Sequence, residues 1–153
     1  KHAHHAFDLD TPGKDSHAHR EAGASEVLVA SGRRWALMHE LREEEEPRLA
    51  DLLARLSPVD LVIVEGFKRE AHPKVEIHRA ANGKSWLFPD IPGVRGLICD
   101  TEPPGWTGPR VGIDAAEAAA NLLASAADPF SEVVDRLRAT PPVELARRPR
   151  RAS

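Results

Sequence analysis

The chain has 153 residues, a length typical of one domain and sufficient to bury a sizeable core. Hydrophobic residues make up 41% of it and charged residues 29%, as in an ordinary soluble globular protein. The net charge of −3 gives no electrostatic reason to expect nucleic acid or a membrane surface as a partner. No apolar run reaches the roughly 18–20 residues that a membrane span needs.

The single cysteine and the start of the chain suggest a compartment and an incomplete sequence. Cys99 has no second cysteine to pair with, so an internal disulfide is excluded and the reducing cytoplasm is the expected location. The chain opens with "KHAHH", without an initiator Met or the apolar segment of a signal peptide. We therefore expect it to be a fragment whose true amino terminus is missing.

The first part of the chain is expected to contain a short helix, a hairpin and a longer helix. Ser16 is placed to cap a helix that ends near residue 22. The β-branched run 26–31 and the alternating run 35–40 predict a hairpin or two neighbouring strands. Residues 42–57, "REEEEPRLADLLARLS", put acids and Pro47 at the start of a helix with leucines on one face.

The second part predicts a parallel sheet covered by helices. Residues 60–67, "DLVIVEGF", form an unbroken apolar run, which indicates a strand buried on both faces. Asp114 is placed to cap an alanine-rich helix that ends near Ala127. Strands separated by helices indicate an α/β layered fold with a mainly parallel sheet. The further strands are expected at residues 74–79, 94–100 and 109–114.

The carboxyl-terminal part changes in composition. After Pro129 a brief helix is expected at residues 131–138, followed by "TPPVELARRPRRAS", which is broken by prolines and rich in arginine. We interpret this last stretch as a mobile tail or a linker. The predicted organisation is therefore one domain at residues 1–128 and a short helix with a basic tail at 129–153.

The segment "VIVEGFKRE" is the most specific candidate for chemistry. In open α/β sheets ligands bind beyond the carboxyl ends of the strands, and Glu65 ends the apolar run there. Gly66 allows a ligand to approach closely, and Lys68 adds positive charge just beyond it. An acid in this place is typical of a Walker B residue, which holds Mg²⁺ directly or through water. The alternative is a solvated acid followed by a turn.

The segment "TPGKDS" resembles the end of a phosphate-binding loop but does not match one. The pattern G-x-x-x-x-G-K-[ST] requires glycine where Asp8 stands, and Asp15 separates Lys14 from Ser16. Lys14 can still act as a point charge toward phosphate. Asp15 could orient water or help to hold Mg²⁺. The alternative is an ordinary turn followed by a helix cap.

Two further groups of residues have candidate roles. His2, His4 and His5 could bind a transition metal, but their spacing lacks the paired Cys/His pattern of a structural zinc site. A polar loop that contacts phosphate or a partner is the favoured interpretation. Asp100, with Thr101 after it, also follows an apolar run. It could accept hydrogen bonds from a purine base or begin a proline turn.

Three stretches in the right order resemble one family, the molybdopterin-guanine dinucleotide biosynthesis adapter proteins (MobB). They are "KHAHHAFDLDTPGKDSHAHREAGASEVLVAS", "RWALMHELR" and "DLVIVEGFKREAHPKVEIHR", and the resemblance extends from Lys1 to about Asp128. It implies a P-loop NTPase-like three-layer α/β fold and usually a homodimer. It also implies binding of GTP and Mg²⁺, weak GTP hydrolysis at most, and association with the molybdenum cofactor guanylyltransferase. Molybdopterin is a further ligand to be considered.

The resemblance also assigns roles by position. Asp10, Lys14 and Asp15 would line the nucleotide side, and Glu65 would be the Walker B acid beside Gly66. Asp100 and Thr101 match the base-side loop less closely.

One departure from the family is large. Its first strand and Walker A loop precede the "KHxHH" segment with which this chain begins, so we expect the chain as written to bind GTP poorly. Two other functions stay open, a histidine-rich metallochaperone and a P-loop kinase for a small molecule. The kinase would need a substrate pocket with a catalytic base, and we locate none in the sequence.

Overall fold

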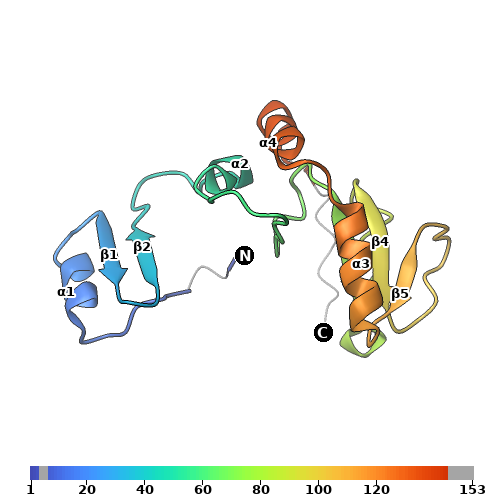
Figure 1. The fold of residues 1–153 in the computed structure, drawn as a ribbon, viewed down its shortest axis with the longest axis horizontal. Coiled ribbons are helices and arrows are strands. Elements are labelled where there is room, and N and C mark those ends of the chain that lie inside the picture. Colours follow the sequence, from blue (N-terminus) through green and yellow to red (C-terminus); the bar gives the residue numbers. More distant parts are fainter. Residues whose placement is uncertain (4–6, 145–153) are drawn as a thin grey trace, which may run out of the picture. The chain divides into compact units, whose positions relative to one another are not determined.

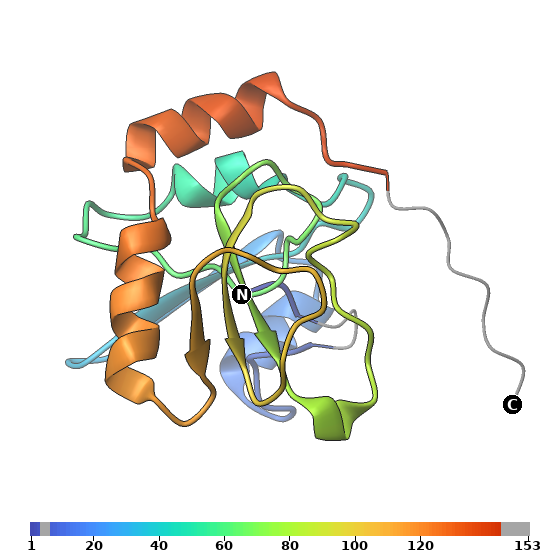
Figure 2. The same cartoon turned by 90° about the vertical axis from the view of Figure 1, so that its right-hand side faces the viewer.

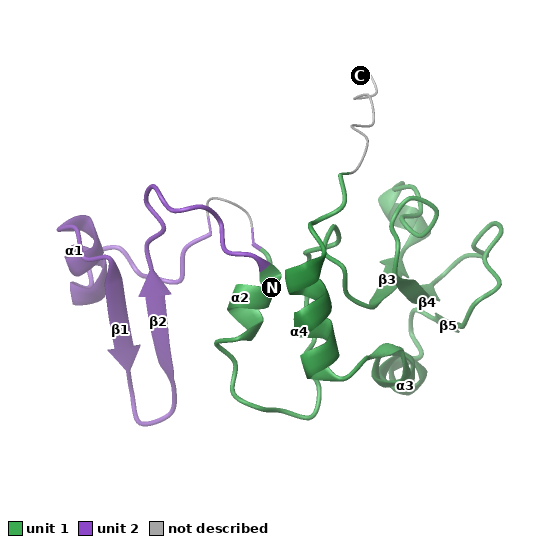
Figure 3. Cartoon of the chain, turned by 90° about the horizontal axis from the view of Figure 1, so that it is seen from above, with its two compact units in different colours: residues 1–2, 49–153 green, residues 3–48 purple. Residues whose placement is uncertain are grey.

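The computed structural model describes residues 1–3 and 7–144 of the chain. They fall into two compact units (Figures 1 and 3): unit 2 contains residues 3–48, and unit 1 contains residues 1–2 together with the chain from residue 49. His4, His5 and the arginine-rich end of the predicted tail, 145–153, lie outside the described residues. No helix in the described ranges combines the length and the apolar character required to cross a membrane.

Unit 2 consists of one short helix and the predicted hairpin. Helix α1 covers Asp15–Glu21, and strands β1 (Glu26–Ala30) and β2 (Trp35–His39) pair antiparallel. The helix starts two residues earlier than expected, because Lys14 and not Ser16 is its N-cap residue. The predicted cap by Ser16 is therefore wrong: this hydroxyl lies inside the helix and donates to a carboxylate outside it.

Helix α2 is much shorter than the sequence predicts. It covers only Leu49–Leu53, whereas residues 42–48 form turns and irregular chain. Pro47 has no backbone N–H to donate inside a helix, and the acids at 43–46 repel one another. The helix therefore forms only where its leucine face is buried. That face packs with helix α4 (Phe130–Ala139) in one buried cluster. Its members are Leu49, Ala50, Leu53, Val134 and Leu137.

The expected parallel sheet is present in unit 1. Strands β3 (Lys74–His78), β4 (Val94–Cys99) and β5 (Arg110–Gly112) pair parallel in the order β3-β4-β5. Figure 2 shows them side by side in green, yellow and gold. A 3₁₀ turn, η1 (Ala80–Asn82), follows β3. Because all three strands point the same way, their carboxyl ends lie at one edge of the sheet.

Helix α3 (Ala116–Ala126) packs on this sheet. Gly96 of β4 makes the packing close: a Cβ at this position would lie 2.8 Å from Cδ1 of Leu122, which is buried. The helix ends where the alanine-rich pattern predicts. Its N-cap is Ala115 with no side-chain hydrogen bond, so the predicted cap by Asp114 is wrong.

The apolar run before Glu65 differs most from expectation. Residues 59–66 are not a strand, and Val59, Leu61 and Ile63 are exposed, whereas Val62 and Val64 pack against the cluster of α2 and α4. The prediction of a strand buried on both faces is therefore wrong for the described chain. A strand requires paired neighbours, and β3 is paired on one side only, with β4.

The described chain beyond α3, as far as residue 144, contains a helix and makes defined contacts. The second predicted helix is confirmed as α4. After it, Arg69 and Val143 exchange two hydrogen bonds: the N–H of Val143 donates to the Arg69 carbonyl, and Arg69 Nε donates to the Val143 carbonyl, both at 2.8 Å. The start of the predicted tail is thus attached to the segment that follows Glu65.

Candidate functional site

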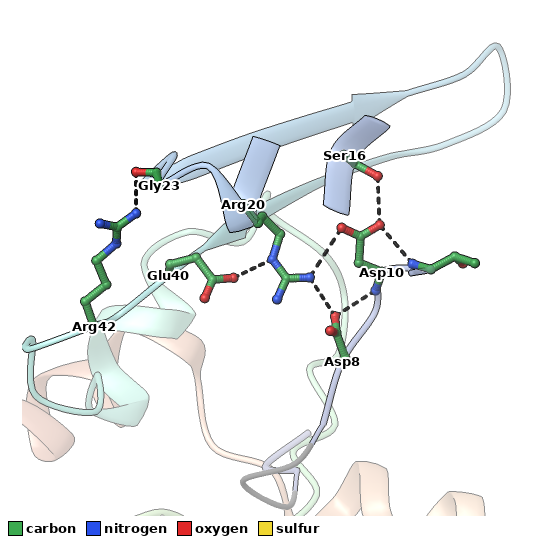
Figure 4. Close-up of polar contacts among 8 residues, drawn as sticks. Asp8, Asp10, Ser16, Arg20, Gly23, Glu40 and Arg42 are labelled. Atoms are coloured by element: carbon green, nitrogen blue, oxygen red, sulfur yellow. Dashed lines mark hydrogen bonds and ion pairs between the residues drawn. The ribbon is translucent and has the colours of Figure 1, made fainter. Parts of the chain in front are cut away.

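The loop before α1 is held by one arginine (Figure 4). Arg20 Nη1 lies 2.9 Å from Asp8 Oδ1 and 3.3 Å from Asp10 Oδ2, and its Nε donates to Glu40 Oε1 at 2.6 Å. Asp10 Oδ1 also accepts from the Ser16 hydroxyl at 2.7 Å. Only 18% of the Arg20 side chain and 6% of the Asp10 side chain are exposed. The loop, the helix and the end of β2 are therefore joined by one set of charged hydrogen bonds.

The charges in this cluster are stabilised by one another. The hydrogen bond from Ser16 is the main cause that lowers the pKa of Asp10, and the backbone N–H of Asp10 is the main cause for Asp8. Bonds to Asp8 and Glu40 raise the pKa of Arg20. Asp8, Asp10 and Arg20 are thus charged at neutral pH. Both carboxylate oxygens of Asp10 accept hydrogen bonds within the loop and from α1, and its placement on the nucleotide side stays a prediction.

Lys14 and Asp15 lie open to solvent at the end of this loop. Both residues are exposed, at the junction between the Pro12-Gly13 turn and α1. Gly13 has φ +84°, a conformation that favours glycine, and the N–H of Lys14 donates to the Thr11 carbonyl at 3.2 Å. The turn therefore places an ammonium group and a carboxylate side by side in sequence on a braced loop.

Glu65 and Gly66 form a second candidate site with the first residues of the chain. The backbone N–H of His2 donates to the Glu65 carbonyl at 2.8 Å, and the Lys1 ammonium lies 3.3 Å from Glu65 Oε2. Gly66 has φ +86°, and a Cβ there would lie 2.6 Å from the Cβ of His2. The position therefore requires glycine. The rings of His2 and Phe67 lie 5.0 Å apart and close this contact.

The carboxylate of Glu65 is accessible. Its side chain is 65% exposed and that of Lys1 is 73% exposed, so the ion pair is screened by water and contributes little to stability. Glu65, Gly66 and Lys68 also line an apolar cavity of about 580 Å³ in unit 1. The same cavity is lined by β3 and by residues 59–64, including the exposed Leu61 and Ile63. The structure thus brings together these three predicted residues.

Asp100 and Thr101 follow β4 at the carboxyl edge of the sheet. Asp100 Oδ1 accepts a hydrogen bond from the N–H of Ala80 at 2.8 Å, which ties the η1 turn to the end of β4. Both residues are exposed and line a separate depression with Arg110. A carboxylate has two oxygens, so Asp100 keeps the capacity to accept further hydrogen bonds.

The candidate residues therefore belong to two units. Asp10, Lys14 and Asp15 lie in unit 2, whereas Glu65, Gly66, Lys68, Asp100 and Thr101 lie in unit 1. Within the described chain, no group of three or more His, Cys, Asp or Glu side chains is assembled to hold a metal ion. Of the histidines considered for metal binding, only His2 is described, and it packs on Phe67.

Arg20 is the residue that the sequence interpretation missed. Its partners are 12, 10 and 20 residues away along the chain, and such distances give no local pattern. The one local signal is the spacing from Ser16 to Arg20, because residues four apart lie on the same face of a helix. Both side chains reach Asp10 from that face.

Comparisons with known proteins identify relatives of the chain. The family model of "Molybdopterin guanine dinucleotide synthesis protein B" (MobB) matches residues 1–100. A molybdopterin-guanine dinucleotide biosynthesis adapter protein of Escherichia coli (strain K12) is 49% identical over 85 residues, which are 54% of this chain and 49% of the relative. One of Haemophilus influenzae (strain ATCC 51907 / DSM 11121 / KW20 / Rd) is 45% identical over 82 residues, 52% of this chain and 44% of the relative. The chain thus spans about half the length of the curated relatives it matches.

Proposed function

Because the chain belongs to the molybdopterin guanine dinucleotide synthesis protein B family, we propose that it is part of a GTP-binding adapter protein for the biosynthesis of that cofactor in the cytoplasm. The observation that carries the proposal is the extent of the family match: residues 1–100 include both the braced loop of unit 2 and the Glu65–Gly66 turn. Any hydrolysis of GTP is weak, and the main role is that of an adapter.

The braced loop supplies the first group of nucleotide contacts. Lys14 is exposed and offers an ammonium charge to phosphate oxygens, and Asp15 beside it orients water or a hydrated cation. Arg20 and Asp10 keep this loop in one conformation through bonds that need no ligand. A loop that is ordered before binding loses less conformational entropy when the ligand arrives.

Glu65 fits the role of a Mg²⁺ ligand. Mg²⁺ usually keeps several waters and binds one or two carboxylates together with substrate phosphates. The Glu65 carboxylate is exposed, and its ion pair with Lys1 is screened by water, so a cation can replace Lys1 at small cost. The metal would neutralise phosphate charge, and Lys68 adds a second positive charge, while Gly66 lets His2 lie close against this turn.

The base and the partners complete the proposal. Asp100 and Thr101 recognise the guanine edge. The hydrogen bond from Ala80 occupies only Oδ1 of Asp100, so this carboxylate can accept further hydrogen bonds from the base. The names of the relatives describe adapters in the biosynthesis of molybdopterin guanine dinucleotide, and an adapter implies a partner enzyme. We propose the molybdenum cofactor guanylyltransferase as that partner, with molybdopterin as a further ligand and a homodimer as the assembly.

A nucleotide titration tests the assignment. In the intact protein with Mg²⁺, Glu65→Gln and Lys14→Ala are each expected to weaken GTP binding at least about tenfold. Each substitution removes a charge-assisted contact that contributes about 1.5–3 kcal/mol. Glu132→Gln is the matched control, because it neutralises an exposed acid of α4 outside the proposed site. Equal GTP affinity in all variants would show that neither loop contacts the nucleotide.

A further inference from the structure

The turn that follows Glu65 has a backbone conformation that its sequence does not favour. Gly66 and Phe67 both have positive φ, +86° and +48°. Glycine adopts this conformation freely, but a residue with a side chain does so at a cost, because its Cβ comes close to the following carbonyl oxygen. Such a conformation persists only where the surrounding structure fixes it. The contacts around Phe67 therefore determine the shape of this turn.

Helix α4 is the first support of the turn. The Phe67 side chain is partly buried and packs against the cluster that α2 and α4 share, to which α4 contributes the fully buried Leu137. The N–H of Glu70 donates to the Phe67 carbonyl at 3.0 Å and closes the turn. Phe67 is thus anchored on a helix near the end of the chain, whereas Glu65 and Lys68 on either side of it are exposed.

The second support is the segment after α4, residues 140–144, which we call the carboxyl-terminal strap. Its Val143 forms two hydrogen bonds of 2.8 Å with Arg69, which lies 74 positions earlier in the chain. One runs from the Val143 N–H to the Arg69 carbonyl, and the other from Arg69 Nε to the Val143 carbonyl. The family match ends at residue 100, so α4 and the strap lie outside the part that the family model describes.

We propose that α4 and the carboxyl-terminal strap hold residues 65–69 in the conformation that binds Mg²⁺ and phosphate, with Arg69 as a positioning residue. This inference rests on the proposed function, in which Glu65 and Lys68 are the ligand-binding groups of the turn. When Arg69 leaves the strap, the strained Phe67 relaxes and the two charged groups move with it. A turn that is fixed before binding loses less conformational entropy when the ligand arrives. The end of the chain thereby controls the affinity of a site far from it in sequence.

Hydrogen exchange and GTP titration of the intact protein test the proposal together. Val143→Pro removes the N–H donor of the strap without changing any charge. It is expected to speed amide exchange at residues 66–70 in the nucleotide-free protein, and to weaken Mg²⁺-dependent GTP binding about threefold to tenfold. Val143→Ala is the matched control, because it keeps both backbone groups and should change the affinity by no more than about twofold.

Substitutions of Arg69 separate its bond to the strap from its charge. Arg69→Met removes both and should weaken GTP binding, whereas Arg69→Lys keeps a charged donor near the Val143 carbonyl and should restore most of the affinity. Arg138→Met removes an exposed arginine of α4 and is the control for the loss of charge. Val143→Pro combined with Arg69→Met should weaken binding clearly less than the product of the two single effects, because both changes break the same link.

Three results overturn the proposal. They are unchanged exchange at residues 66–70 in Val143→Pro, faster exchange with unchanged GTP affinity, and strict multiplication of the effects of Arg69→Met and Val143→Pro. Circular dichroism checks that each variant is folded at the temperature of the titration. A wild-type protein that binds no GTP refutes the proposed function, whereas hydrogen exchange still decides whether the strap holds the turn.

Discussion

Glu76 is a buried acid whose carboxylate binds backbone N–H groups. Its two carboxylate oxygens accept hydrogen bonds from the N–H groups of Leu87 and Phe88 at 2.8 and 2.9 Å. These bonds fix the loop after η1 to β3. They also position Phe88. The ring centroid of Phe88 lies 5.7 Å from that of Trp86 and 5.1 Å from that of Trp106.

Replacing this acid tests its structural role. Glu76→Ala leaves two backbone N–H groups without their acceptor, so we expect the free energy of unfolding to fall by about 2–3 kcal/mol in chemical denaturation. Glu117→Ala removes an exposed acid of α3 as a control and should change stability by no more than about 0.5 kcal/mol. Equal effects of the two substitutions would show that the carboxylate of Glu76 is not needed for the loop.

His72 gives the stability of unit 1 a dependence on pH. Burial, and to a lesser extent the charge of Lys74, lowers the pKa of His72 to about 4. That ammonium group donates to the carbonyls of Glu70, His72 and Pro92. In the unfolded chain histidine titrates near pH 6.5, at about its ordinary value. Between pH 6.5 and 4 the unfolded state thus binds more protons, and stability falls as the pH falls.

The predicted loss is measurable. From pH 7 to pH 4, His72 should contribute a decrease in the free energy of unfolding on the order of 2–3 kcal/mol, after allowance for partial exposure. The difference between wild type and His72→Phe, followed by denaturant titration at several pH values, isolates this contribution from that of the acids. His39 shifts the opposite way, because Glu26 and then Glu44 raise its pKa. Its contribution is present below pH 6.5 and lost as the pH rises through the raised pKa.

Arg20 and Glu65 differ in how far a local sequence pattern indicates their roles. Glu65 is a candidate because it ends an apolar run next to a glycine, a pattern contained in a few consecutive letters of the sequence. The hub role of Arg20 depends on three carboxylates brought together by a turn, a helix and a hairpin. No local pattern contains that information. For the same reason the sequence does not indicate that the oxygens of Asp10 accept hydrogen bonds from Ser16 and Arg20.

At the scale of the elements, the close contact of α3 with β4 depends on glycine at position 96, which has no side chain. Gly96→Ala places a Cβ 2.8 Å from Leu122 Cδ1 and forces the leucine or the helix to move. We expect a loss of about 1–3 kcal/mol in the free energy of unfolding. Gly112→Ala in β5 is the control: its Cβ would meet no atom within 4 Å, so the change should be below about 0.5 kcal/mol.

A double-mutant cycle identifies the cause. Leu122→Ala alone opens a cavity and should cost about 2–5 kcal/mol. Combined with Gly96→Ala it should cost clearly less than the sum of the two single changes, because the new methyl group occupies part of the space that the leucine leaves. Strict additivity in thermal or chemical unfolding would mean that the two residues do not compete for the same space.

The sequence predicted a helix or strand well where the hydrophobic pattern of that segment alone is sufficient to identify it. The hairpin, the strands β3, β4 and β5, and the helices α3 and α4 were all expected near their observed positions. The errors share a physical cause. Residues 59–66 have the composition of a buried strand, but a strand forms only where neighbours satisfy its backbone groups. Helix α2 shortened because the acids and Pro47 have no apolar face to bury.

At the scale of the whole molecule, the sequence indicated an α/β chain with a mainly parallel sheet, and unit 1 has such a sheet. It did not indicate that residues 3–48 form a compact unit of their own. Hydrophobic periodicity reports which side of each element is buried, but it does not say which elements share a core. For the same reason the candidate residues could be named one by one, whereas their grouping into two units required coordinates.

The bond between His2 and Glu65 gives the chain an unusual connectivity. Residues 1–2 are already part of unit 1, and the chain re-enters that unit at Leu49. Unit 2 is therefore an insertion, a single long excursion between two points of its host. The entropy of closing such an excursion rises by only about 0.6 kcal/mol for each doubling of its length. The length of unit 2 can accordingly vary while the entropy cost of closing it changes little.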